Sequence, residues 1–192
     1  MKNLFFAISF IAIGVGTMVS LVASVGPSSA KGHTRVLLTN GIDPPAGYRD
    51  WPLISVARVG SPVNDMRAKL GNPVAITAFR EGKLPFPDGT IIARLAYHQA
   101  TSEENNNAVR GILEKQFGPE TTQKLLSESF VAGEATNVQF MIKDSKKYAS
   151  TGGWGFFQFT NGKLDGDAVH QTCFSCHSPA KDRDFVFTRY SQ

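Results

Sequence analysis

Two cysteines and a histidine lie together near the C-terminus, in the stretch Cys-Phe-Ser-Cys-His at residues 173–177. Cys173 and Cys176 are the only cysteines among the 192 residues. Closely spaced cysteines can form a redox disulfide, bind zinc or attach a haem covalently. The surrounding residues must decide between these three chemistries.

The histidine that follows the second cysteine favours haem attachment. In Cys-x-x-Cys-His, each thiol adds to a vinyl group of the porphyrin and the histidine binds the iron. Positions i, i+3 and i+4 share one face of a helix, so Cys173, Cys176 and His177 can act together. A disulfide needs no histidine, and a tetrahedral zinc site needs a further ligand that no second cysteine pair supplies. We interpret Cys173 and Cys176 as the thioether donors of one haem c and His177 as its axial ligand.

The motif is expected to end a helix over 168–177, because no helix breaker interrupts this stretch and Pro179 follows it. His170 lies on the same helix as His177, so it cannot reach the opposite side of the iron. A sixth ligand would have to come from His33, His98, Met66 or Met141.

Residues 1–30 have the composition of an export signal. They contain a single lysine, a long apolar run and small residues at plausible cleavage positions. The run also approaches the roughly 20 apolar residues that span a bilayer, so an uncleaved N-terminal anchor is the alternative. In both cases residues 31–192 leave the cytoplasm, and their number suits a single domain.

The charge of the exported part excludes one class of partner. Removing residues 1–30 leaves 19 basic and 16 acidic side chains. This excess is small and the basic residues are dispersed, so we expect no binding to nucleic acid.

The middle of the chain predicts strands with one helical block between them. Runs of β-branched and aromatic residues bounded by turn residues predict strands at 51–59, 90–99, 137–144 and 154–159, with a last one at 184–190. Apolar residues at helical spacing predict a helical segment at about 102–131. The polar stretch 61–72 is expected to form a loop or a short helix. The predicted fold class is α+β, mainly an antiparallel sheet with packed helices and a C-terminal helix for haem attachment.

Arg94 occupies a notable position in the predicted strand 90–99. Strand alternation places it on one face with Ile92, Ala96 and His98. Its stem could lie on the sheet with its head in water, or its guanidinium could face the propionates or a ligand in a cofactor pocket. Both interpretations remain open at this point.

Several segments together resemble the cytochrome P-460 family, which also includes cytochrome c′-beta. The specific matches are the block from Lys-Asp-Ser-Lys-Lys-Tyr (143–148) to Gly-Gly-Trp-Gly and the C-terminal Cys-Phe-Ser-Cys-His with Asp-Phe-Val-Phe-Thr-Arg-Tyr. Weaker matches lie at 48–51 and 85–97. The resemblance runs from about Tyr48 to Gln192, and its helical segment is variable. On composition alone, 143–148 would be a solvated charged turn.

The resemblance implies a periplasmic, homodimeric, largely β haem protein. Its proximal iron ligand would be His177, and the other side of the iron would be open. Members named for the family oxidise hydroxylamine and nitric oxide with a haem cross-linked to a lysine, whereas cytochrome c′-beta lacks the cross-link and binds small gases.

This sequence departs from the cross-linked pattern at Arg94. In members that form the bond, the lysine lies six residues after the aspartate of the Asp-Gly-Thr turn, and counting from Asp88 reaches Arg94. A guanidinium stays protonated and is a poor nucleophile. We therefore expect an unmodified haem and consider hydroxylamine oxidation doubtful.

These inferences define a favoured function and one alternative, beside a third and weaker one, a sensor or scaffold that holds haem structurally. The first is an exported c-type haem protein that binds nitric oxide or a similar small ligand at an open distal site, with nitrogen-oxide redox activity and a cytochrome as redox partner. The alternative is a six-coordinate electron-transfer cytochrome c in which Met141 or His98 is the sixth ligand.

Covalent attachment predicts the mass of the mature protein. Because both thiols would be consumed by vinyl groups, the mass should equal the chain without its signal plus one haem. Mass spectrometry after treatment with an alkylating reagent should detect no modified thiol. Two alkylated cysteines, or a disulfide without haem, would contradict the interpretation of the motif.

Overall fold

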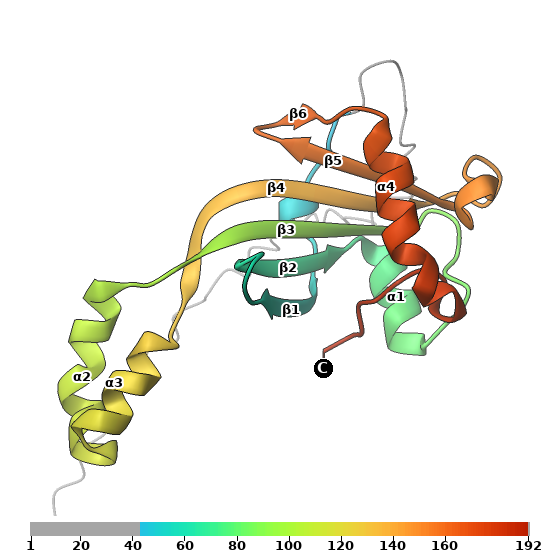
Figure 1. Cartoon of the computed structure of the whole chain (residues 1–192). Helices are drawn as coiled ribbons and strands as arrows, with labels where there is room; N and C mark the ends of the chain where they lie inside the picture. The colour runs from blue at the N-terminus through green and yellow to red at the C-terminus, as the bar shows by residue number, and fades with distance from the viewer. Residues whose placement is uncertain (1–42, 192) are drawn as a thin grey trace, which may run out of the picture. The chain divides into compact units, whose positions relative to one another are not determined.

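A six-stranded antiparallel sheet forms the centre of the computed structural model, which describes residues 43–191 (Figure 1). The strands follow one another in the sheet in chain order: β1 (Leu53–Val59), β2 (Asp65–Gly71), β3 (Ile91–Ala100), β4 (Val131–Lys143), β5 (Trp154–Thr160) and β6 (Lys163–Leu164). The α-helices are α1 (Pro73–Glu81), α2 (Glu103–Phe117), α3 (Pro119–Ser127) and α4 (Ala168–His177). The predicted α+β class is confirmed.

The described residues belong to one unit of the chain. The contacts divide the chain into Met1–Val36 and Leu37–Gln192. The predicted signal or anchor at 1–30 and the ligand candidate His33 lie outside the described residues. None of the helices within 43–191 has the length and hydropathy needed to cross a membrane.

Two secondary-structure predictions are wrong. The stretch 61–72 was expected to form a loop or short helix, but it contains strand β2. The charged side chains of β2 belong to a polar network on the sheet. In the sequence, such charged residues have the composition of a surface loop. Residues 184–190 form no strand, because Asp184 and Phe185 have φ angles of 51° and 64°, which turn the backbone away from an extended path.

Each face of the sheet carries its own cluster of buried apolar residues, and successive residues of β3 contribute to the two clusters in turn. On the face that packs against α1, α4 and the C-terminal segment, the buried residues are Ile54, Ala75, Ile76, Ala78, Phe86, Ile92, Trp154, Phe156 and Val186. The opposite face buries Leu70, Ile91, Ala93, Leu95, Val138, Phe140, Ile142 and Phe159. We call the face that packs against α1 and α4 the helix face. The candidate site lies on this face.

Helix α1 begins at a cap that also joins it to the sheet. The Asn72 Oδ1 accepts a hydrogen bond from the Ala75 amide at 2.9 Å and another from the Ile91 amide at 3.1 Å. Pro73 at the first helical position and Gly82 in the left-handed conformation mark the two ends. The sequence therefore contained start and stop signals for a helix that was not predicted.

Helix α4 has the predicted bounds and packs against β5 (Figure 1). Asp167 precedes it without forming a side-chain cap, and Ser178 continues directly into a short 3-10 turn that ends at Arg183. This turn leads the chain back past the C-terminal end of the helix.

Helices α2 and α3 form the predicted helical segment between β3 and β4. They pack against each other, and α2 has no buried side chain. The break between them falls at Gly118, as the Gly118-Pro119 pair indicates. This hairpin therefore contributes little to the core beside the sheet.

We predict that the same substitution, Phe to Ala, will destabilise the protein by different amounts at two positions. Phe159 is 2% exposed on the sheet, whereas Phe117 is 45% exposed on α2. Phe159→Ala should lower the free energy of unfolding by about 3–5 kcal/mol, and Phe117→Ala by less than about 1 kcal/mol. Urea denaturation measures both, and equal losses would contradict the described core.

Candidate functional site

The register of the sheet builds the floor of a pocket on the helix face. Cross-strand pairing aligns an apolar row next to a polar row. The apolar row runs across Ile92, Met141 and Phe156, and the polar row runs across Lys69, Arg94, Gln139 and Gln158. Side chains directly opposite on neighbouring strands contact one another, so each row presents one kind of surface.

Helix α4 and the C-terminal segment close this pocket. Cys173 and His177 line it from α4, and Val186 and Phe187 line it from the segment beyond the 3-10 turn. The structure thus brings Arg94 into the same pocket as two of the three motif residues. The cavity measures about 130 Å³, which is below the roughly 300 Å³ of pockets that enclose whole cofactors.

The two cysteines differ in exposure. Both are free thiols, with Cys173 half-buried in the pocket and Cys176 exposed. Burial, followed by the neighbouring Cys176, raises the pKa of the Cys173 thiol, while the positive charge of Arg94 opposes this shift. Burial therefore favours the thiol form of Cys173, and positions i and i+3 place both cysteines on one side of α4.

His177 is held as a neutral imidazole with one nitrogen available. Its Nδ1 lies 2.7 Å from the carbonyl oxygen of Phe185. A carbonyl only accepts, so Nδ1 carries the proton and Nε2 keeps its lone pair. Burial lowers the pKa of His177, and the hydrogen bond to Phe185 acts in the opposite direction. A neutral ring of this tautomer is the form that binds a metal ion through Nε2.

Three basic side chains surround one carboxylate on the polar side of the pocket. Arg94 Nη2 lies 2.7 Å from Asp65 Oδ2, and Arg67 Nε lies 2.9 Å from the same atom. Burial, followed by repulsion from Arg67, lowers the pKa of both Arg94 and Lys69. The group has an excess of positive charge, and the buried Arg94 Nε has no hydrogen-bond partner. Such a wall suits an anionic group.

Side-chain hydrogen bonds extend this polar row across the sheet. Arg94 Nη1 donates to Gln139 Oε1 at 2.9 Å, Gln139 donates to Gln158, and Gln158 Nε2 donates to Asp165 Oδ2 at 2.5 Å. The sequence pointed to Arg94 alone. Its partners lie on other strands, and only the register aligns them.

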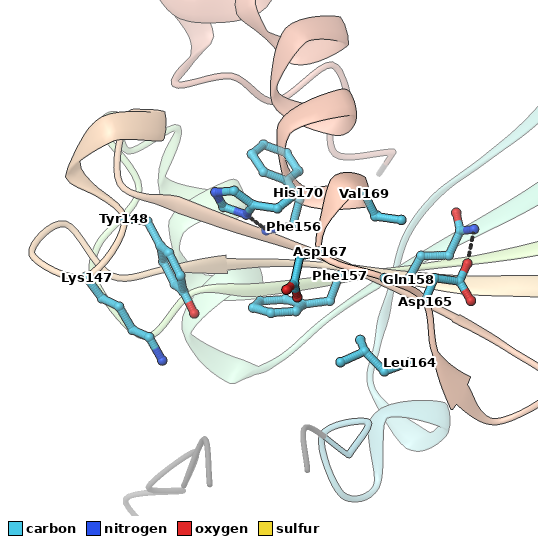
Figure 2. A pocket seen from close by; sticks show the side chains of 11 residues that line it. Lys147, Tyr148, Phe156, Phe157, Gln158, Leu164, Asp165, Asp167, Val169 and His170 are labelled. Carbon is cyan, nitrogen blue, oxygen red and sulfur yellow. Dashed lines mark hydrogen bonds between the residues drawn. The ribbon is translucent and has the colours of Figure 1, made fainter. Parts of the chain in front are cut away.

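A second cavity of about 320 Å³ lies beside the first, between β5, the start of α4 and Tyr148 (Figure 2). Phe156 and Phe157 line both cavities. Figure 2 shows His170 directed at β5, where its Nδ1 accepts a hydrogen bond from the Phe156 amide at 3.1 Å. His170 thus ties α4 to the sheet and lines this second cavity, which His177 does not line.

The candidates for a sixth iron ligand have different positions. Met141 lines the pocket with His177. His98 is exposed and does not line it. Met66 is half-buried on β2, where it pairs with Tyr97 on the opposite side of the strand from Asp65 and Arg67. Of the described candidates, only Met141 is brought near the motif.

The interpretation of 143–148 as a solvated turn is wrong for Lys143. This side chain is 6% exposed and forms an ion pair with Asp184. The rest of the segment is a turn held by Asp144, whose Oδ1 accepts hydrogen bonds from the Lys146 and Lys147 amides at 3.1 and 2.9 Å. Lys143 is the first residue of this charged run, and the run gave no signal that its side chain is buried.

The residues of the pocket fit a haem. Thiols and a neutral histidine are the donors that c-type attachment uses. The apolar row suits the faces of a macrocycle, and the basic wall with its unpaired Arg94 Nε suits its propionates. An α+β domain of this kind, with a Cys-x-x-Cys-His helix packed against a basic and aromatic pocket, defines a class of cytochrome.

The family comparison agrees with this class. A sequence model of the cytochrome P-460 family matches residues 45–188. The chain therefore belongs to the cytochrome P-460 family, as the resemblance indicated, and membership implies a haem cofactor. A comparison with curated proteins found no match.

We predict that Arg94 stabilises the fold through Asp65. Arg94→Met should lower the free energy of unfolding by about 1–3 kcal/mol, because Asp65 would lose one of two charged partners in a buried setting. Arg94→Lys, which keeps the charge, should lose less. Arg110→Met on α2 serves as the control, because the half-buried Arg110 donates a hydrogen bond to Gln123 at 3.2 Å but has no ion pair with a buried carboxylate; it should change stability by less than about 1 kcal/mol. Equal losses for Arg94 and Arg110 in urea denaturation would contradict the ion-pair network.

Proposed function

We propose that this chain is an exported c-type haem protein that binds a small ligand, with nitric oxide as the favoured ligand. The observation that carries the proposal is the hydrogen bond between His177 Nδ1 and the Phe185 carbonyl, which leaves Nε2 free in a pocket shared with Cys173. In a family that implies haem, this arrangement suits a proximal ligand.

In this proposal Cys173 and Cys176 form thioether bonds to one haem c, and His177 is the axial ligand. The haem iron supplies a coordination site for a small ligand. The protein contributes the orientation of the imidazole, an apolar surface at Ile92 and Phe156, and positive charge for the propionates. These contributions come from α4 and from strands β2, β3 and β5, so the site requires the folded sheet.

Arg94 would leave the porphyrin without a third bond to the protein. Its guanidinium is held by Asp65 and Gln139 and remains protonated, since an arginine does not lose its proton in proteins. It therefore serves as a fixed donor at the pocket. This supports ligand binding of the cytochrome c′-beta kind over hydroxylamine oxidation, and leaves nitrogen-oxide redox activity as a further expectation.

The location and assembly of the protein belong to the same proposal. The N-terminal segment and the family resemblance support a periplasmic protein, either released or anchored. The resemblance also supports a homodimer and a cytochrome as redox partner.

The second candidate function is electron transfer by a six-coordinate haem. The observation that favours it is the position of Met141, whose side chain lines the pocket, since a thioether is a good axial ligand. His98 is a poor candidate because it is exposed outside the pocket.

Ligand binding predicts a five-coordinate ferrous haem. The reduced protein should bind nitric oxide or carbon monoxide readily, and its absorption spectrum should stay unchanged in Met141→Leu. Met66→Leu, on another strand, is the matched control. A six-coordinate low-spin ferrous spectrum that is lost only in Met141→Leu would instead establish the electron carrier.

A further inference from the structure

We infer that the buried ion pair between Lys143 and Asp184, which does not line the pocket, positions the imidazole of His177 through the backbone of Asp184 and Phe185. Lys143 is at the end of β4, and Asp184 follows the 3-10 turn after α4. The inference rests on the proposed function, in which His177 binds the haem iron. Lys143 and Asp184 would then be positioning residues.

The ion pair is strongly constrained. Lys143 Nζ lies 2.7 and 2.8 Å from the two Asp184 carboxylate oxygens and 3.1 Å from the carbonyl oxygen of Gly152. It also lies 5.0 Å from the centre of the Trp154 ring. The two side chains are only 6% and 9% exposed. A charge in this setting is costly without its partner, so the two side chains hold each other in place.

Asp184 carries this constraint into the backbone. Its Oδ2 also accepts a hydrogen bond from the Phe86 amide at 2.8 Å. Asp184 and Phe185 both have positive φ angles, of 51° and 64°. Residues other than glycine rarely adopt such angles. Two consecutive residues in this region need an external anchor. The ion pair and the Phe86 amide provide one for Asp184.

The Phe185 ring is held on the same side by a close approach to a glycine. Gly152 has a φ angle of 67°, and a Cβ at this position would overlap the Phe185 ring. The Gly152 carbonyl is also the third partner of Lys143. Lys143, Gly152 and Asp184 therefore fix the Phe185 residue from both its ring and its preceding peptide.

The consequence falls on the Phe185 carbonyl, which accepts the His177 Nδ1–H at 2.7 Å. The direction of this carbonyl depends on the backbone dihedral angles of Asp184 and Phe185. Only the two side-chain torsions of Asp184 lie between this stretch of backbone and the anchored carboxylate. A short hydrogen bond to the second nitrogen of a ligating histidine fixes the ring and raises its basicity. The ion pair thus acts on the iron ligand without touching it.

The test compares Lys143→Met and Asp184→Asn in the haem-loaded protein. Loss of the charge pair should loosen the Phe185 carbonyl and weaken its hydrogen bond to His177. Resonance Raman spectra of the ferrous protein should then show the iron–histidine stretching band at lower frequency, and the reduction potential should rise because the imidazole donates less charge. Lys143→Arg keeps the charge, so its iron–histidine frequency and reduction potential should stay closer to those of the unsubstituted protein.

One control and one double variant separate positioning from general stability. Phe159→Ala destabilises the opposite face of the sheet and should leave the band and the potential unchanged. Asp184→Asn retains an acceptor for the Phe86 amide and is the milder variant if Lys143→Met does not fold. The double variant should shift the band no further than the larger single shift, because both substitutions remove one interaction.

The outcomes distinguish this inference from the proposed function. If both variants lose stability but keep the band and potential of the Phe159→Ala control, the ion pair is only structural and the inference is overturned. The proposed function predicts an iron–histidine band in the unsubstituted protein and its loss in His177→Gly. If the band is missing from the unsubstituted protein, or persists in His177→Gly, the proposed function fails and this inference fails with it.

Discussion

The hydrogen bond between His177 Nδ1 and the Phe185 carbonyl connects the candidate iron ligand to the rest of the fold. His177 is the last residue of α4, and Phe185 follows the 3-10 turn that reverses the chain. This contact selects the tautomer with Nε2 free, and it depends on a backbone conformation that Asp184 and Lys143 hold. The orientation of one ring therefore depends on residues from β4, the 3-10 turn and the C-terminal segment.

The helix face of the sheet combines two surfaces that a haem requires. Cross-strand pairing places Ile92, Met141 and Phe156 in one row and the polar residues around Arg94 in the next. The apolar row presents no hydrogen-bonding side chains, whereas the polar row holds an excess of positive charge against Asp65. Because the side-chain period of a strand is two, a register slip of one residue would exchange these rows for residues of the opposite face.

Much of this arrangement could be predicted from local sequence. The bounds of α4, the faces of β3 and the two-helix segment follow from periodicity and breakers, which act within one element. Strand β2 was missed because Asp65, Arg67 and Lys69 alternate as they would on a solvated strand or loop. The burial of Lys143 and the polar partners of Arg94 depend on contacts between distant segments, and composition does not reveal such contacts.

The central claim is that His177 binds the iron of a haem held by both cysteines, with the other side of the iron open. The most direct measurement is a crystal structure of the purified, reduced protein. It should show thioether bonds at Cys173 and Cys176, His177 Nε2 bound to the iron, and no protein side chain bound on the opposite side. Electron density that places the Met141 sulfur on the iron, or that joins the two cysteines in a disulfide, would contradict the account.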